Sequence, residues 1–138
     1  MTRKDFQDIS RLRLRESGVL LRAKEWAGAY YLAGYSIECG LKACICKNVK
    51  RHSFPDRPLA NGFFSHVLED LVKLAGLNQS LDAEMKRSTT FRANWGVVKD
   101  WKETSRYRSE ITREEARGIY EAITSRTFGI KTWMCKHW

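Results

Sequence analysis

Glu38 and Lys42 are the residues whose types and spacing could do chemistry in the most apolar stretch of the chain, residues 26–48. They stand four positions apart, so a helix places both on one face. An unpaired carboxylate in such a helix would be costly, and the fork of an arginine can satisfy both carboxylate oxygens at once. We therefore expect an ion pair between Glu38 and Arg106, which lies in a later polar connection.

This expected ion pair has two interpretations. In the structural one, the pair is a lock that holds the polar connection over the apolar helix. In the functional one, it belongs to a ligand pocket with tyrosines from both segments, lined by Tyr31, Tyr35, Glu38, Arg106 and Tyr107.

A second pattern mixes aromatic and basic residues between positions 92 and 108. Aromatic rings stack on nucleic-acid bases and cations hold phosphates, so the mixture is typical of a nucleotide or RNA surface. The residues are Trp95, Trp101 and Tyr107 among Arg92, Lys99, Lys102, Arg106 and Arg108. Trp95 shares a helical face with Phe91 and Val98, which predicts a core position, whereas we expect Trp101 and Tyr107 to be more open. Both patterns together define one candidate ligand or structural polar site: Tyr31, Tyr35, Glu38, Lys42, Trp101, Arg106, Tyr107 and Arg108.

The histidines and cysteines form no recognised catalytic or metal-binding pattern. His66 falls in the first turn of an expected helix, where it either makes a hydrogen bond near the helix start or acts in catalysis. The cysteines are spaced unlike zinc ligands, which favours small buried thiols over a metal site or disulfide; they are Cys39, Cys44, Cys46 and Cys135. We expect no metal and no cofactor.

Hydrophobic periodicity places these residues on helices. A first helix is expected over residues 4–24 and the central one over 26–48, with only a short turn between them, so the two are antiparallel. The prolines and turn residues of 50–62 predict a surface loop. Further helices are expected over 63–76, ending at Gly76, and over 80–101 with Ser80 as N-cap. Thr112-Arg-Glu-Glu115 is a capping box, which predicts a last helix with buried positions as far as Met134.

The fold class is therefore all-α: an up-and-down bundle of about five helices with a four-helix core, in one domain over residues 1–138. The net charge is +9, which suits a phosphate-bearing or acidic partner. The chain begins with a charged segment rather than a signal peptide, and its uncharged run is too short to span a membrane. We expect a cytoplasmic protein with no membrane association.

Three segments, in order, resemble the HEPN family (higher eukaryotes and prokaryotes nucleotide-binding), in particular its small bacterial single-domain type. Residues 29–43, Ala-Tyr-Tyr-Leu-Ala-Gly-Tyr-Ser-Ile-Glu-Cys-Gly-Leu-Lys-Ala, resemble its second helix. Residues 66–76, from His-Val-Leu-Glu-Asp-Leu, resemble its His-x-Leu-x-x-Leu helix. Residues 101–107, ending in Arg-Tyr, resemble its late Arg-Tyr segment. The resemblance implies a HEPN-like helical bundle that pairs through its helices, hence a homodimer.

Many HEPN proteins are metal-independent ribonucleases in which four to six residues separate an arginine from a following histidine. The resemblance implies that such a histidine acts on the ribose hydroxyl or the leaving oxygen while the arginine holds the phosphate. None of His52, His66 and His137 has an arginine at that spacing. We therefore expect no enzymatic activity from that motif.

The function that follows is a non-catalytic HEPN module that binds nucleotide, nucleic acid or a partner protein. The resemblance implies a bacterial toxin–antitoxin or defence setting, with a nucleotidyltransferase-type protein as candidate partner. One alternative is a metal-independent RNase toxin with a variant active site around Arg106 and Tyr107. A further alternative is a pure protein-interaction domain whose basic charge serves solubility or an acidic partner.

Overall fold

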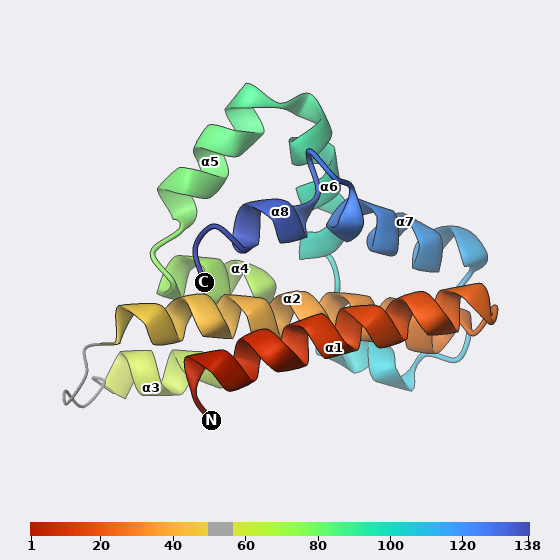
Figure 1. Cartoon of the computed structure of the whole chain (residues 1–138), viewed down its shortest axis with the longest axis horizontal. Coiled ribbons are helices and arrows are strands. Elements are labelled where there is room, and N and C mark those ends of the chain that lie inside the picture. The colour runs from red at the N-terminus through yellow and green to blue at the C-terminus, as the bar shows by residue number, and fades with distance from the viewer. Residues whose placement is uncertain (50–56) are drawn as a thin grey trace.

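The computed structural model describes residues 1–49 and 57–138. Over these residues the chain is all-helical, with eight α-helices, one 3₁₀ helix and no strand, as Figure 1 shows. The elements are α1 (Arg3–Arg22), α2 (Trp26–Asn48), α3 (Arg57–Phe63), α4 (Leu68–Leu74), α5 (Asn78–Arg87), α6 (Thr89–Lys99), η1 (Glu103–Tyr107), α7 (Arg113–Thr124) and α8 (Ile130–Met134). The all-α class is confirmed, but the number of helices exceeds the expected five.

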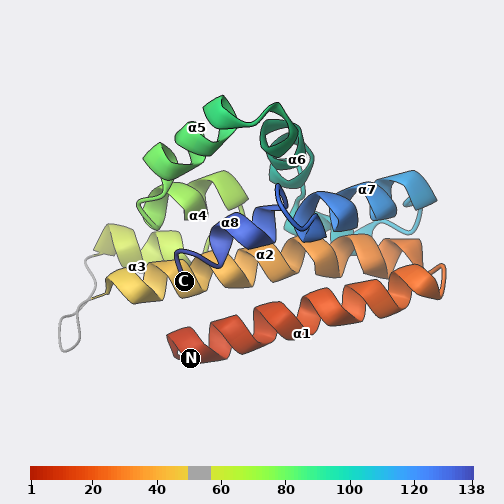
Figure 2. The same ribbon diagram turned by 45° about the horizontal axis from the view of Figure 1, so that its top comes forward.

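The long antiparallel pair α1 and α2 is the base of the molecule (Figure 2). Thr2 begins α1 with a reciprocal capping box to Asp5, and Lys24 turns the chain with a φ of 63°. Serines of α1 reach backbone carbonyls of α2: Ser17 Oγ donates to Ala29 at 2.6 Å. Such bonds need a close approach of the two helices, which the small residues of α2 allow.

The apolar helix α2 is central, as its sequence predicts, and packs against α1, α4, α7, η1 and α8. Gly34 and Gly40 permit the closest of these contacts. A Cβ at Gly34 would stand 2.2 Å from the ring of Trp101, and one at Gly40 would stand 2.2 Å from Met134. Gly34 is therefore required by packing against the rigid Trp101 ring, whereas a side chain at position 40 would have to displace the flexible end of Met134.

The expected single helix over 80–101 is wrong, because the chain breaks at Ser88. The backbone of Ser88 is extended, with a φ of −137°, and its side chain accepts a hydrogen bond from the Phe91 amide at 3.1 Å. Ser88 is thus the N-cap of α6, whereas Ser80 lies inside α5 and is not a cap. The break lets α6 fold back beside α5, and together they form an arch above α2 (Figure 1).

Two other boundaries differ from the expectation. The predicted loop over 50–62 contains α3 from Arg57 onward, while its part over 50–56, with His52, lies outside the described residues. The helix expected over 63–76 is the shorter α4, because Phe63 already ends α3. The predicted stop is confirmed, since Gly76 follows α4 with a φ of 72°.

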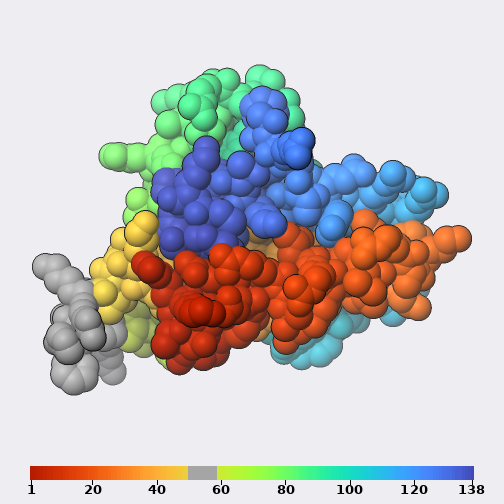
Figure 3. Space-filling view, in the orientation of Figure 1, coloured from red at the N-terminus to blue at the C-terminus, as the bar shows by residue number. Residues whose placement is uncertain are grey.

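The C-terminal part is two helices rather than one. Thr112 caps α7 as predicted, accepting from the Glu115 amide at 3.1 Å. The chain then turns at Gly129, where a Cβ would stand 2.3 Å from the Ser125 carbonyl oxygen, so a side chain has no room. The segment from α8 to the C-terminus lies between α1 and the α5–α6 arch, as the blue surface in Figure 3 shows.

Candidate functional site

The Glu38 carboxylate lies in a buried polar cluster on α2. The residue is 1% exposed, and its Oε1 accepts a hydrogen bond from Lys42 Nζ at 2.9 Å. His66 Nδ1, which precedes α4, lies 2.9 Å from the same oxygen. Glu38 Oε2 has no hydrogen-bond partner among the described residues. The cluster fixes the chain before α4 to the middle of α2, and it orients the imidazole of His66.

The expected ion pair between Glu38 and Arg106 does not form. Arg106 lies in η1, where residues three apart are superimposed along the helix axis, and it pairs with Glu103 at 2.7 Å. Its guanidinium also lies 4.8 Å from the centre of the Tyr107 ring and close to the Tyr31 hydroxyl. The expected long-range pair is thus replaced by two local arrangements. Arg106 pairs with Glu103, and the Glu38 carboxylate contacts His66 and Lys42 instead.

The predicted aromatic residues meet where η1 crosses α2. Tyr31 stacks on Tyr35 with ring centres 5.8 Å apart, and its ring lies 5.9 Å from that of Trp101. Burial raises the pKa of Tyr35 to about 12, so its hydroxyl stays protonated. Trp101 is only 2% exposed, since its ring covers Gly34. The expectation that Trp101 is open is therefore wrong.

The remaining predicted site residues lie outside this cluster. Tyr107 is 74% exposed, which confirms the expectation that it is open. Arg108 reaches Glu115 on α7 at 3.3 Å, at the surface. The structure thus brings Tyr31, Tyr35 and Trp101 together, with the Arg106 guanidinium close to Tyr31, and leaves Tyr107 and Arg108 at the rim.

A hollow of about 390 Å³ lies between the start of α4 and η1, and His66 lines it. The half-exposed imidazole is held through Nδ1 by Glu38, which leaves its Nε2 to hydrogen-bond a molecule in the hollow. The charges around the hollow are mixed, which does not favour a phosphate; they come from Lys99, Lys102, Glu69, Asp100 and Glu103.

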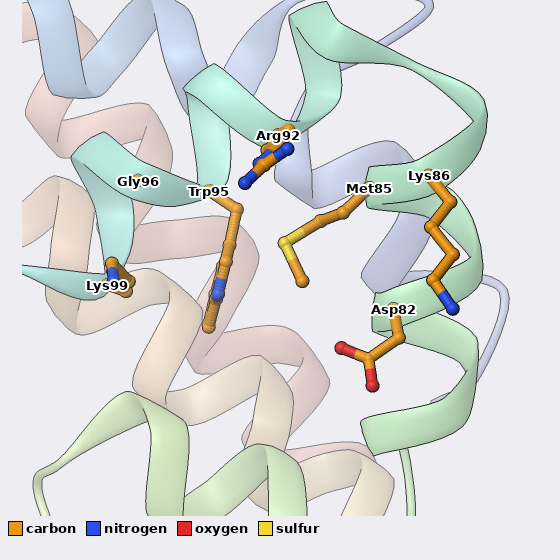
Figure 4. Close-up of a pocket in the computed structure, with 7 residues that line it drawn as sticks. All are labelled: Asp82, Met85, Lys86, Arg92, Trp95, Gly96 and Lys99. Carbon is orange, nitrogen blue, oxygen red and sulfur yellow. The ribbon is translucent and has the colours of Figure 1, made fainter.

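A second hollow, of about 450 Å³, lies between α5 and α6 and shares Lys99 with the first. We call it the α5–α6 pocket; it is lined by Asp82, Met85, Lys86, Arg92, Trp95, Gly96 and Lys99. The α5 residues stand three and four positions apart and so do those of α6, so each set occupies one helical face. Figure 4 shows the Met85 thioether and the Asp82 carboxylate projecting from α5 toward Trp95 on α6.

The basic side chains of the α5–α6 pocket form no ion pair with the described part of the protein. Lys86, Arg92 and Lys99 are exposed, and none of them forms an ion pair within residues 1–49 and 57–138. The walls between them are apolar: Trp95 is 4% exposed and Met85 is partly buried beside it. The arrangement can hold an anionic group at the rim and a flat apolar group against the wall.

The sequence indicated only part of the α5–α6 pocket. Arg92, Trp95 and Lys99 belong to the aromatic–basic pattern, and Trp95 is buried as expected. Asp82, Met85 and Lys86 were not expected to join them, because a continuous helix would have kept α5 and α6 in line. The signal that could have located the pocket is Ser88, whose side chain favours an N-cap over a helix interior.

The C-terminal segment positions α5. Ser80 Oγ accepts a hydrogen bond from Trp133 Nε1 at 2.9 Å and lies 3.1 Å from His137 Nε2. Burial lowers the pKa of His137, so the neutral imidazole accepts the Ser80 proton at Nε2. This link joins α5 to α8 and to the residues after it, and it holds one wall of the α5–α6 pocket in place.

The four cysteines are free thiols that are buried or partly buried in the protein. Cys39 and Cys44 are buried, and burial raises their pKa to about 11 and about 12, so they stay protonated and unreactive. Cys46 and Cys135 are partly buried. Across the described part of the chain, histidine, cysteine and acidic side chains nowhere gather in threes as a metal ion would require.

Comparison with known proteins adds no relative: no protein-family model, no curated protein and no solved structure matches the chain. Among the described helices, none combines the length and the apolar character that crossing a bilayer requires.

Proposed function

We propose that the chain is a binding module for nucleotides or single-stranded RNA, and that the α5–α6 pocket is its ligand site. The observation that carries this proposal is a set of three cations without an ion-pair partner among the described residues, around the apolar wall of Met85 and Trp95: Lys86, Arg92 and Lys99. Cations attract phosphates, and the apolar wall takes the face or edge of a base. The net charge of +9 supports a polyanionic ligand.

The resemblance to the HEPN family supports a more specific proposal: a non-catalytic HEPN module in a bacterial toxin–antitoxin or defence system, with a nucleotidyltransferase-type partner. The absence of the arginine–histidine ribonuclease spacing supports the non-catalytic reading. The alternative RNase site around Arg106 has weaker support, because its guanidinium already forms an ion pair with Glu103.

The first test fills the pocket without disturbing the fold. Gly96 lines the pocket, and a Cβ there would meet nothing within 4 Å. Leucine also favours a helix interior more than glycine does. We expect Gly96→Leu to bind a labelled single-stranded RNA at least about tenfold more weakly than the wild type, a difference of ~1.4 kcal/mol.

Gly118 provides the matched control. It lies on α7 and a Cβ there also meets nothing within 4 Å, but it is remote from the pocket in sequence and is not part of its lining. Gly118→Leu should bind like the wild type, and thermal unfolding should show that both variants fold. Equal binding by Gly96→Leu and the wild type would contradict the proposal.

A second test separates the pocket from general basic charge. Arg92→Ala and Arg113→Ala each remove one exposed cation, but Arg113 lies at the start of α7, beside the turn between α1 and α2. Only Arg92→Ala should weaken binding strongly and make it less dependent on salt. Equal losses from both variants would indicate a diffuse electrostatic surface instead.

A further inference from the structure

The α5–α6 pocket contains a carboxylate that a site for phosphate alone would not need. Asp82 lines the pocket on α5, one turn before Lys86, yet the two do not form an ion pair, and Asp82 pairs with no other cation of the described residues. A negative charge beside Arg92 and Lys99 weakens their attraction for phosphate. Its presence there makes sense if the ligand carries hydrogen-bond donors as well as an anionic group.

A nucleotide has both an anionic phosphate and a base that carries hydrogen-bond donors. The nucleobases differ in the donors and acceptors that they present to a carboxylate. Guanine presents two neighbouring donors, N1–H and the N2 amino group, which can bond to the two oxygens of one carboxylate. Adenine and cytosine place a ring acceptor beside their amino group, and uracil places two carbonyls around its single N–H. An ionised carboxylate accepts only, so it is repelled by those neighbouring acceptors.

We propose that the α5–α6 pocket selects guanine, with Asp82 accepting from N1–H and the N2 amino group while Arg92 and Lys99 hold the phosphate. The base then lies against Met85, whose soft thioether makes favourable contacts with aromatic rings. The hollow of about 450 Å³ is of the size in which proteins hold small ligands. This inference rests on the proposed function, and both a free guanine nucleotide and a guanosine of single-stranded RNA present the same chemistry.

The first experiment compares the wild type with five nucleoside monophosphates: GMP, IMP, AMP, CMP and UMP. IMP keeps N1–H and lacks the N2 amino group, so it reports on the second hydrogen bond alone. Dissociation constants from calorimetry should rank GMP tightest, IMP weaker, and the other three at least about tenfold weaker than GMP, the discrimination expected from one bidentate pair.

The variant Asp82→Asn tests the residue itself. Asparagine keeps the shape but replaces one acceptor oxygen with a donor amide, so GMP should bind about tenfold more weakly. The other nucleotides should bind as well as before or better, because the Asp82 carboxylate no longer repels their phosphate. A folding defect would weaken all five alike, so these opposite changes identify base recognition. Glu84→Gln is the control, since it removes a carboxylate from the same helix outside the pocket lining.

Different results would contradict the proposed function and the guanine inference. If the wild type binds none of the five nucleotides and no single-stranded RNA, the proposed function falls. If it binds all nucleotides equally, or if Asp82→Asn keeps the preference for GMP, the guanine inference falls and the proposed function stands. Competition then separates the two sources: tighter binding of the RNA UUGUU than of GMP, with displacement by GMP, indicates guanosine in RNA, whereas tighter GMP indicates the free nucleotide.

Discussion

Replacing Glu38 by glutamine should destabilise the protein more than any change of an exposed charge. The residue is 1% exposed, and its Oε1 holds both Lys42 Nζ and His66 Nδ1 at 2.9 Å. Glutamine keeps the shape but removes the negative charge, so the Lys42 ammonium, whose side chain is only 10% exposed, loses its counter-ion. Breaking a buried pair in this way costs ~3–5 kcal/mol.

For a chain of this length, such a loss lowers the melting temperature by roughly 10–17 °C, because unfolding entropy scales with residue number. Thermal and urea unfolding, followed by circular dichroism, measure the change. Glu103→Gln is the control: it breaks the more exposed pair with Arg106, which water screens, so its effect should be much smaller.

Removing the charges of both Glu38 and Lys42 should lower the free energy of unfolding by less than the sum of the two single replacements. Lys42→Met alone leaves the Glu38 carboxylate buried with only His66, whereas Glu38→Gln with Lys42→Met leaves neither ion unpaired. The double variant should therefore be less destabilised than the sum of the single variants, by 1 kcal/mol or more, roughly the coupling seen for residues in one ion-pair network. A Glu38→Gln variant as stable as Glu103→Gln, or strict additivity in the cycle, would refute the reasoning.

Three further outcomes are expected. Purified protein should leave structured and unstructured RNA intact, with and without divalent metal; cleavage that disappears in Arg106→Ala would instead establish the RNase alternative. The chain should be a homodimer in light scattering at micromolar concentration, at twice its mass of 16.1 kDa, because Phe64 and Val67 are 74% and 53% exposed on neighbouring positions; a mass of one chain would exclude this. Stability should fall as the pH drops below about 6.5, since burial lowers the pKa of His137 and the unfolded chain then binds a proton that the folded chain does not; the loss should shrink in His137→Gln.

The central helix α2 and the start of α7 could be predicted from the sequence because the residues that determine them are local. The run of apolar and small residues over 26–48 is too long for a strand, and α2 has those bounds. Thr112 is followed by two acidic residues that suit a helix start, and it is the N-cap of α7. In each case the residues that determine the element lie within the element or next to it.

The candidate site could be predicted only in part because its contacts depend on how the helices fold back. Arg106 pairs with Glu103 rather than with Glu38, because the 3₁₀ geometry of η1, which the sequence did not reveal, places Glu103 beside it. His66 was placed at a helix start, but its partner is on α2, 28 positions earlier in the chain. The α5–α6 pocket exists only because the chain breaks at Ser88.

The Glu38 cluster on α2 and the α5–α6 pocket differ in whether their charges are free to bind a ligand. On α2, Glu38 and Lys42 bind each other and are almost wholly buried, so their charges stabilise the fold and cannot also attract a partner. On α5 and α6 the opposite holds, because Arg92 and Lys99 are exposed and unpaired within the described residues. Binding free energy comes from charges that find a better partner in the ligand than in the protein or in water. The ligand site that we propose therefore lies between α5 and α6, and the cluster around Glu38 holds the helices beneath it.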